Sequence, residues 1–219
     1  MSESITKVNV WSVRLRWAHG LLALSTLFLL LTGWLSGSSG DLAETARGYH
    51  FLAGYVFSLS LLFRIYLLFA GSKSEHYRDC LPPKDPVAVI SQHLRFYLSL
   101  GKTELNGWYA HNPFWGPVYL FIFALSILMV LSGFAIGKLY LGSAISLTGL
   151  HAFGAGVMLI FVVAHLFAVI LHDIKAETTG ISAILSGNKY FERDTESSAG
   201  PVEFPVKFNV MPGKKDRNS

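Results

Sequence analysis

The sequence has little charge and almost no cysteine. Only 15% of its 219 residues are charged, whereas an ordinary soluble domain carries about a quarter. Cys80 is the one cysteine, so the chain cannot form an internal disulfide and lacks the C-x-x-C-H motif that attaches a c-type haem. Cysteine clusters that hold zinc or iron–sulfur are excluded as well. A metal bound here must therefore be held by histidine or carboxylate, or inside a porphyrin.

The apolar residues, 52% of the chain, are gathered in four long runs. Each run is long enough to cross about 30 Å of hydrocarbon as a helix. They cover approximately residues 17–35, 48–70, 114–136 and 149–171. The first run is longer than the apolar part of a signal peptide, so we expect it to be a retained helix. The sequence predicts an all-α fold, an integral membrane four-helix bundle.

Lysine and arginine predict the orientation of the bundle. Of the 18 such residues, the short loops after the first and third runs carry one each, Arg47 and Lys138. Nearly all the others lie in the N-terminal segment, the central loop and the C-terminal tail. The positive-inside rule then places both termini and the central loop in the cytoplasm.

The central loop and the tail complete the predicted organisation. A short helix is expected over residues 85–100, after Pro82 and Pro83. It is predicted to lie at the cytoplasmic membrane surface, although an ordinary soluble loop helix stays open as an alternative. Residues 1–194 are expected to form the membrane domain, and residues 195–219 a polar, extended tail.

Four of the eight histidines fall within the predicted spans, where ionisable side chains are rare and mark function. His19 lies near the cytoplasmic end of the first span, and His50 near the outer end of the second. In the fourth span His151 lies near the outer surface and His165 near the inner one. Depth therefore sorts them into an outer pair, His50 with His151, and an inner pair, His19 with His165.

The spacing of His151 and His165 indicates what the pairs bind. Their 14-residue separation corresponds to about 21 Å along a helix and about 40° around it. Two haems stacked across a bilayer, each held by two imidazoles, need this arrangement, and such haems transfer electrons because no site is open for oxygen. Histidines that only hydrogen-bond between helices, a proton relay and a non-haem metal site remain alternatives. A metal site usually recruits Asp or Glu, which the four runs lack.

Several motifs share their order and spacing with a known family. They are V-R-L-R-W-A-H at 13–19, Y-H-F-L-A-G-Y at 49–55, F-R-I-Y at 63–66, H-N-P at 111–113, S-G-F at 132–134, H-L-F-A-V-I-L-H-D-I at 165–174 and I-S-A-I-L-S-G at 181–187. Over residues 8–194 the sequence resembles the b-type cytochrome subunit of membrane-bound nickel–iron hydrogenases. The wider superfamily includes the membrane subunits of formate dehydrogenase and thiosulfate reductase. One departure is Gly20, where the family usually has tryptophan, which puts the packing beside a haem in doubt but not its ligation.

The resemblance implies a multi-pass subunit of the bacterial inner membrane that carries two haem b groups. It implies that His50 and His151 ligate the outer haem iron, and His19 and His165 the inner one. Electrons would come from the iron–sulfur small subunit and nickel–iron large subunit on the periplasmic side, and would leave to quinone near the cytoplasmic face. The chain itself is then an electron-transfer subunit of a hydrogen:quinone oxidoreductase rather than a catalyst alone. Nothing in the sequence suggests nucleic-acid binding.

Two alternatives of function stay open. The first is the same cytochrome role for formate dehydrogenase or thiosulfate reductase. The second is a transporter that relays protons through histidines, although transporters commonly have more helices and internal repeats.

Further residues are candidates for the cofactor and quinone sites. Arg64, 14 residues after His50, is predicted near the inner haem, where it would either bind a haem propionate or snorkel to the interface. His172 at the cytoplasmic rim is a quinone-site candidate, and so are His111 and Asn112. Each of these three has a plain alternative as a helix cap or an interfacial side chain.

Overall fold

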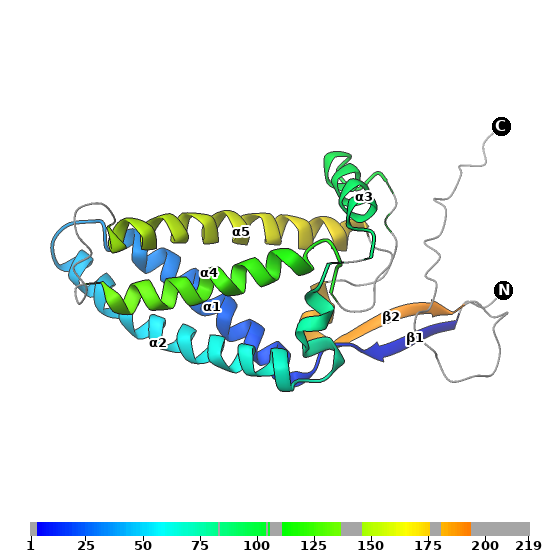
Figure 1. Cartoon of the computed structure of the whole chain (residues 1–219), viewed down its shortest axis with the longest axis horizontal. Helices are drawn as coiled ribbons and strands as arrows, with labels where there is room; N and C mark the ends of the chain where they lie inside the picture. The colour runs from blue at the N-terminus through cyan, green and yellow to red at the C-terminus, as the bar shows by residue number, and fades with distance from the viewer. Residues whose placement is uncertain are drawn as a thin grey trace.

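The structure of the chain is a computed structural model that describes residues 4–82, 84–103, 105, 111–136, 146–175 and 181–193. Its main elements are the long helices α1 (Val13–Leu35), α2 (Asp41–Ala70), α4 (Gly116–Ala135) and α5 (Leu147–Lys175). They run alongside one another down the long axis of the molecule (Figure 1). All four are long and apolar enough to cross a membrane. The predicted helical membrane bundle is confirmed.

Three of the four helices extend beyond the predicted spans, and the first of them, α1, begins at Val13 rather than at 17. α2 begins at Asp41 rather than at 48, and α5 continues to Lys175 rather than to 171. An apolar run marks only the part of a helix that lies in lipid, so the polar end turns were not recognised. At 30 residues, α2 is about 45 Å long. Asp41 and Glu44 lie in its first turn, where negative charge favours the helix dipole.

The bundle is apolar outside and contains small polar side chains inside. Trp34, Leu62 and Phe153 are each more than 60% exposed, as expected for residues that face lipid tails. Ser25 and Ser60 are buried, and each hydroxyl donates a hydrogen bond to a carbonyl of its own helix four residues earlier. Such internal bonds satisfy a hydroxyl where no water is present.

The predicted helix of the central loop is present as α3 (Pro86–Leu98), preceded by the 3₁₀ turns η1 (Lys73–Glu75) and η2 (Tyr77–Cys80). α3 lies across the end of the bundle (Figure 1). Asp85 caps it by accepting a hydrogen bond from the Ala88 N–H, and Pro86 follows at the first helical position. Cys80 in η2 is buried.

α3 carries apolar residues on its outward side and buries aromatic rings on its inward side. Its outward side carries exposed apolar residues at helical spacing, as is typical of a helix at a membrane surface. These are Val87, Ile90, Leu94 and Leu98. Its inward side buries His93 and Phe96. The imidazole of His93 is 3% exposed and stacks on Phe114.

A two-stranded antiparallel sheet was not predicted. β1 (Ser4–Asn9) pairs with β2 (Asn188–Arg193), which follows the short helix α6 (Ile181–Ser186). This β1–β2 ribbon projects from the bundle end that also bears α3 (Figure 1). The predicted C-terminal tail, residues 195–219, lies outside the described residues.

Candidate functional site

The four histidines of the spans form two pairs in space. His50 of α2 faces His151 of α5 with ring centroids 6.2 Å apart, and His19 of α1 faces His165 of α5 at 6.4 Å. α5 thus contributes one imidazole to each pair. The partners in each pair are those that depth along the spans had predicted.

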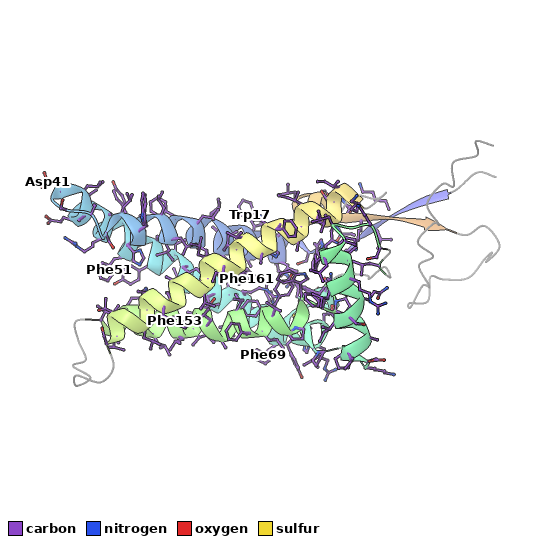
Figure 2. The ribbon with its side chains drawn as sticks, turned by 90° about the horizontal axis from the view of Figure 1, so that it is seen from above. Trp17, Asp41, Phe51, Phe69, Phe153 and Phe161 are labelled. Atoms are coloured by element: carbon purple, nitrogen blue, oxygen red, sulfur yellow. The ribbon has the colours of Figure 1, made fainter. Side chains whose placement is uncertain are left out.

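The two pairs lie at different levels of the bundle. Figure 2 shows Asp41 at the end opposite the β1–β2 ribbon, with Phe51 and Phe153 toward that end. Trp17 and Phe161 lie farther toward the ribbon. His50 and His151 are close in sequence to Phe51 and Phe153, and His19 and His165 are close to Trp17 and Phe161. The two pairs therefore form an outer and an inner layer.

In the outer pair, His50 is oriented by a hydroxyl of α1. Thr32 Oγ1 lies 3.0 Å from His50 Nδ1 and 2.8 Å from the Phe28 carbonyl oxygen. The hydroxyl has a single proton, which it donates to the carbonyl, so it accepts the proton of His50 Nδ1. This tautomer leaves Nε2 as the unprotonated nitrogen, which is the form of imidazole that binds a metal.

His151 has a matching arrangement with α4. Ser132 Oγ lies 2.9 Å from His151 Nδ1 and 3.2 Å from the Met129 carbonyl oxygen. Ser132 donates its one hydroxyl proton to the carbonyl, so its oxygen accepts the proton of His151 Nδ1. His151 Nε2 then carries no proton. Both imidazoles of the outer pair are therefore set to bind through Nε2.

A glycine follows each of these hydroxyl residues. A Cβ atom on Gly33 would lie 3.3 Å from His50 Cε1, and one on Gly133 would lie 3.2 Å from His151 Cε1. Both distances are tighter than ordinary carbon contacts. The hydroxyl–glycine pairs of α1 and α4 thus orient the two rings and leave them room. Sequence reasoning missed this role, although the pairs Thr32-Gly33 and Ser132-Gly133 are visible in the sequence.

The inner pair lies among aromatic rings rather than hydroxyls. His165 stacks on Phe161 with centroids 5.5 Å apart. Trp115 and Tyr119 contact the same imidazole edge-on, at 6.2 and 6.1 Å. These rings restrict how His165 can turn and keep its surroundings apolar.

The geometry and the donor set fit haem iron. Two imidazoles that bind one metal from opposite sides through bonds of about 2 Å would have ring centres roughly 6 Å apart, which is close to both observed separations. Among the described residues no group of three or more His, Cys, Asp or Glu side chains could hold a metal ion. A structural zinc site needs about four such ligands, so pairs of imidazoles fit a porphyrin better.

Arg64 carries a buried charge near the inner layer. Its side chain is 5% exposed, its Nη1 donates to the Glu75 carbonyl oxygen at 3.0 Å, and its guanidinium lies 5.2 Å from the centre of the Phe123 ring. A snorkelling side chain would not be buried in this way. No carboxylate of the described residues forms an ion pair with Arg64. Because a buried guanidinium requires an anion, a haem propionate fits this position.

Glu75 joins the start of α1 to the end of α2. The side chain is fully buried and its carboxylate accepts hydrogen bonds from Ser12 Oγ, from both the N–H and the hydroxyl of Ser72, and from Arg14. Burial alone would raise the pKa of Glu75, but these hydrogen bonds and the Arg14 charge outweigh it and lower the pKa. Ser12 is the N-cap of α1, two turns before His19. Nothing in the sequence pattern marks this loop glutamate.

His172 contacts the helix of the central loop. Its Nε2 lies 3.0 Å from the Tyr97 hydroxyl oxygen, and that oxygen accepts a hydrogen bond from Trp115 Nε1 at 2.7 Å. Phe96 stacks on the ring of His172, with the two ring centroids 4.8 Å apart. Tyr97 was not among the predicted site residues, because its contact joins segments 75 positions apart.

His111 and Asn112 lie close to the inner pair. Tyr119 contacts both His111 and His165. His111 Nδ1 is buried without a hydrogen-bond partner among the described residues, and burial lowers the pKa of His111 to about 4. Asn112 Oδ1 accepts from the Phe114 N–H at 2.9 Å, so this amide shapes the turn before α4. His111 and Asn112 therefore border the inner layer from the α4 side, while His172 borders it from α5.

Comparison with known proteins identifies the family. Residues 10–187 match the family model described as prokaryotic cytochrome b561. A probable Ni/Fe-hydrogenase B-type cytochrome subunit of Cupriavidus necator is 29% identical over 87% of this chain and 90% of its own. The corresponding protein of Azotobacter vinelandii is 29% identical over 86% and 91%, and the probable Ni/Fe-hydrogenase 1 B-type cytochrome subunit of Escherichia coli K12 is 25% identical over 85% and 92%. The resemblance seen in the sequence motifs is confirmed, and the chain belongs to the prokaryotic cytochrome b561 family.

Proposed function

We propose that the chain is the b-type cytochrome subunit of a membrane-bound nickel–iron hydrogenase and passes electrons through two haem b groups to quinone. The observation that carries the proposal is the pair of facing imidazoles at each of two levels of the bundle. Membership of the cytochrome b561 family and the names of the relatives support it.

The residues divide between the two haems by level. His50 and His151 hold the outer iron, and His19 and His165 the inner one. When bound, haem supplies one-electron oxidation and reduction at its iron. With two imidazoles per iron, no position would be open for oxygen or substrate, so the chain would transfer electrons only.

The surrounding side chains prepare the ligands. Thr32 and Ser132 hold the outer imidazoles in the tautomer that leaves Nε2 unprotonated, the form that would bind the iron. Arg64 would pair with a propionate of the inner haem, which would offset the cost of burying both charges. The apolar bundle excludes water from the path between the two levels.

The orientation follows from the charge distribution. We infer that the termini and α3 lie in the cytoplasm, and that the end near Asp41 faces the periplasm and the iron–sulfur small subunit. The haem-binding domain covers residues 1–194, and residues 195–219 form a tail. Quinone is reduced near the inner haem, with His172, His111 and Asn112 as the neighbouring polar groups.

Optical spectroscopy tests the proposal. The purified protein should contain two low-spin b-type haems per chain in a reduced-minus-oxidised spectrum. His151→Ala should remove the outer haem and His165→Ala the inner one, while His76→Ala, in the loop outside both pairs, should keep both. Retention of both haems in His151→Ala would refute the ligand assignment.

Co-purification tests the partner separately. A nickel-containing partner supports the hydrogenase assignment. A molybdenum-containing partner would instead assign the same cytochrome to another periplasmic oxidoreductase, such as formate dehydrogenase or thiosulfate reductase. A colourless chain that carries a pH-dependent ion flux would instead support the proton transporter.

A further inference from the structure

A series of contacts leads from the inner imidazole pair to the helix of the central loop. The ring of His165 contacts Trp115 at 6.2 Å, Trp115 Nε1 lies 2.7 Å from the Tyr97 hydroxyl, and that hydroxyl lies 3.0 Å from His172 Nε2. The series crosses from α5 through the start of α4 to α3 and returns to α5. Tyr97 is thus one side chain away from a ligand of the inner haem.

The chemistry of the groups fixes the direction of one of these two hydrogen bonds. An indole N–H only donates, so the Tyr97 oxygen accepts from Trp115. The contact with His172 Nε2 depends on where the imidazole carries its proton. With Nε2 unprotonated, the Tyr97 hydroxyl donates to it; with Nε2 protonated, the Tyr97 oxygen accepts and its own proton is available to a third partner. Burial raises the pKa of Tyr97, against the opposing effect of the Trp115 bond, so the hydroxyl stays protonated. Tyr97 and His172 form a donor and an acceptor already aligned for proton exchange.

Ring stacking keeps Tyr97 in this position. Phe96 stacks on His172 with ring planes 9° apart, and His93 stacks on Phe114 with planes 8° apart. Gly101, which has a φ of 76°, follows α3 and lies so close to Lys175 that a Cβ atom on it would be 2.5 Å from the lysine Cγ. α3 is therefore fastened to the inner end of α5.

Three charged or titratable groups lie near His172. His93 comes from α3, Asp173 from α5 itself and Lys189 from β2. Burial lowers the pKa of Lys189 to about 8. His172 and Asp173 are partly exposed, so protons from the solvent can reach this group.

We propose that Tyr97 and His172 are the pair that delivers protons to the quinone reduced beside the inner haem, and that α3 is part of the quinone site. This proposal rests on the proposed function. A quinone becomes a hydroquinone by taking two electrons, which arrive one at a time from the inner haem, and two protons. For each new O–H bond, His172 carries a proton on Nε2, Tyr97 gives its hydroxyl proton to a quinone oxygen, and Nε2 passes its proton to the Tyr97 oxygen. Water then replaces the proton on His172. The exposed apolar side of α3 places the pair next to the bilayer, where quinone is dissolved.

The test uses Tyr97→Phe in the complete hydrogenase–cytochrome complex, with decylubiquinone as the acceptor. The ring and its stacking remain, and only the hydroxyl is removed. Haem content, haem spectra and the rate of haem reduction by hydrogen should equal those of the unaltered complex. Quinone reduction should fall by about 100-fold, the lower range for loss of a general acid, and its solvent deuterium isotope effect should change. Tyr77→Phe, in η2 at the same end of the bundle, is the matched control and should leave the rate unchanged.

His172→Gln provides the second variant. It should slow quinone reduction to a similar degree, and the double variant should be no slower than either single one, since the two groups act in one path. Quinone reduction at the original rate in Tyr97→Phe would overturn the proposal, and so would loss of the inner haem in that variant, because the role would then be structural. Absence of haem from the unaltered protein would instead refute the proposed function.

Discussion

Each imidazole of the outer pair is bound at Nδ1 by a hydroxyl from a neighbouring helix. A hydrogen-bond acceptor at Nδ1 makes imidazole a stronger donor to a metal and so favours the oxidised iron. Thr32→Val should therefore raise the midpoint potential of the outer haem by tens of millivolts, because the loss of about 1 kcal/mol corresponds to roughly 40 mV for one electron. A redox titration followed at the haem bands measures it. Thr32→Ser keeps the hydroxyl and should leave the potential unchanged, and an equal shift in both variants would contradict the explanation.

The glycines beside the outer pair give a second prediction for single residues. Gly133→Ala places a methyl group 3.2 Å from the His151 ring, so the ring must move and the outer haem should be lost or bound weakly, while the inner haem remains. Haem content per chain and the reduced spectrum measure this effect. Gly48→Ala, where a Cβ atom meets nothing within 4 Å, is the control and should retain both haems.

What the sequence reveals at this scale depends on how rare a residue is in its setting. Histidine is unusual in a membrane span, so the four imidazoles could be predicted along with their pairing by depth. Thr32 and Ser132 could not, because serine and threonine are common in such helices and usually bond to their own backbone. Their contacts with histidine connect different helices and depend on how those helices rotate against each other.

At the scale of elements, Glu75 fastens the start of α1 to the end of α2. Replacing it by glutamine removes charge-assisted hydrogen bonds and should lower the stability by about 1–3 kcal/mol. Thermal unfolding in detergent measures the loss. Arg14→Gln serves as the control: Arg14 is 57% exposed, and exposed ion pairs contribute only about 0–1 kcal/mol. A loss in Arg14→Gln as large as that in Glu75→Gln would show that the surface charge matters more than the buried network.

The same carboxylate predicts a dependence of stability on pH. The pKa of Glu75 is lower in the folded chain than its ordinary value of 4.5. Its contribution is therefore complete above about pH 4.5 and is lost as the pH falls through the folded pKa. Unfolding temperatures should be measured from about pH 3 to about pH 6, on both sides of the ordinary value. As the pH falls, they should decline more steeply in the unaltered protein than in Glu75→Gln. Parallel curves would contradict this assignment.

Among the elements, the spanning helices and α3 could be predicted because apolar runs and proline signals are local in the sequence. The β1–β2 ribbon could not, since its strands come from the two ends of the chain and pair over about 180 positions. The extra turns of α2 were missed for another reason: Asp41 and Glu44 are polar, and nothing apolar marks a helix that continues past the lipid.

For the whole molecule, the charge distribution predicts a fixed orientation in the membrane. Cys80 is buried, so it should react little with a membrane-impermeant thiol reagent and give a low labelling background. Ser39→Cys, at the end near Asp41, should be labelled in intact spheroplasts, whereas Lys84→Cys, in the central loop, should be labelled only after permeabilisation. Labelling of Lys84→Cys in intact spheroplasts would reverse the proposed orientation and exchange the two haem levels.

The β1–β2 ribbon also has a consequence for how the protein is assembled during synthesis. Ser4–Asn9 is synthesised before all four long helices, and its partner strand, Asn188–Arg193, is synthesised after all of them. The helices must therefore insert while β1 is still unpaired, because β1 and β2 can pair only after β2 has been synthesised. Until then, the pairing that joins the start of α1 to the segment after α5 is absent.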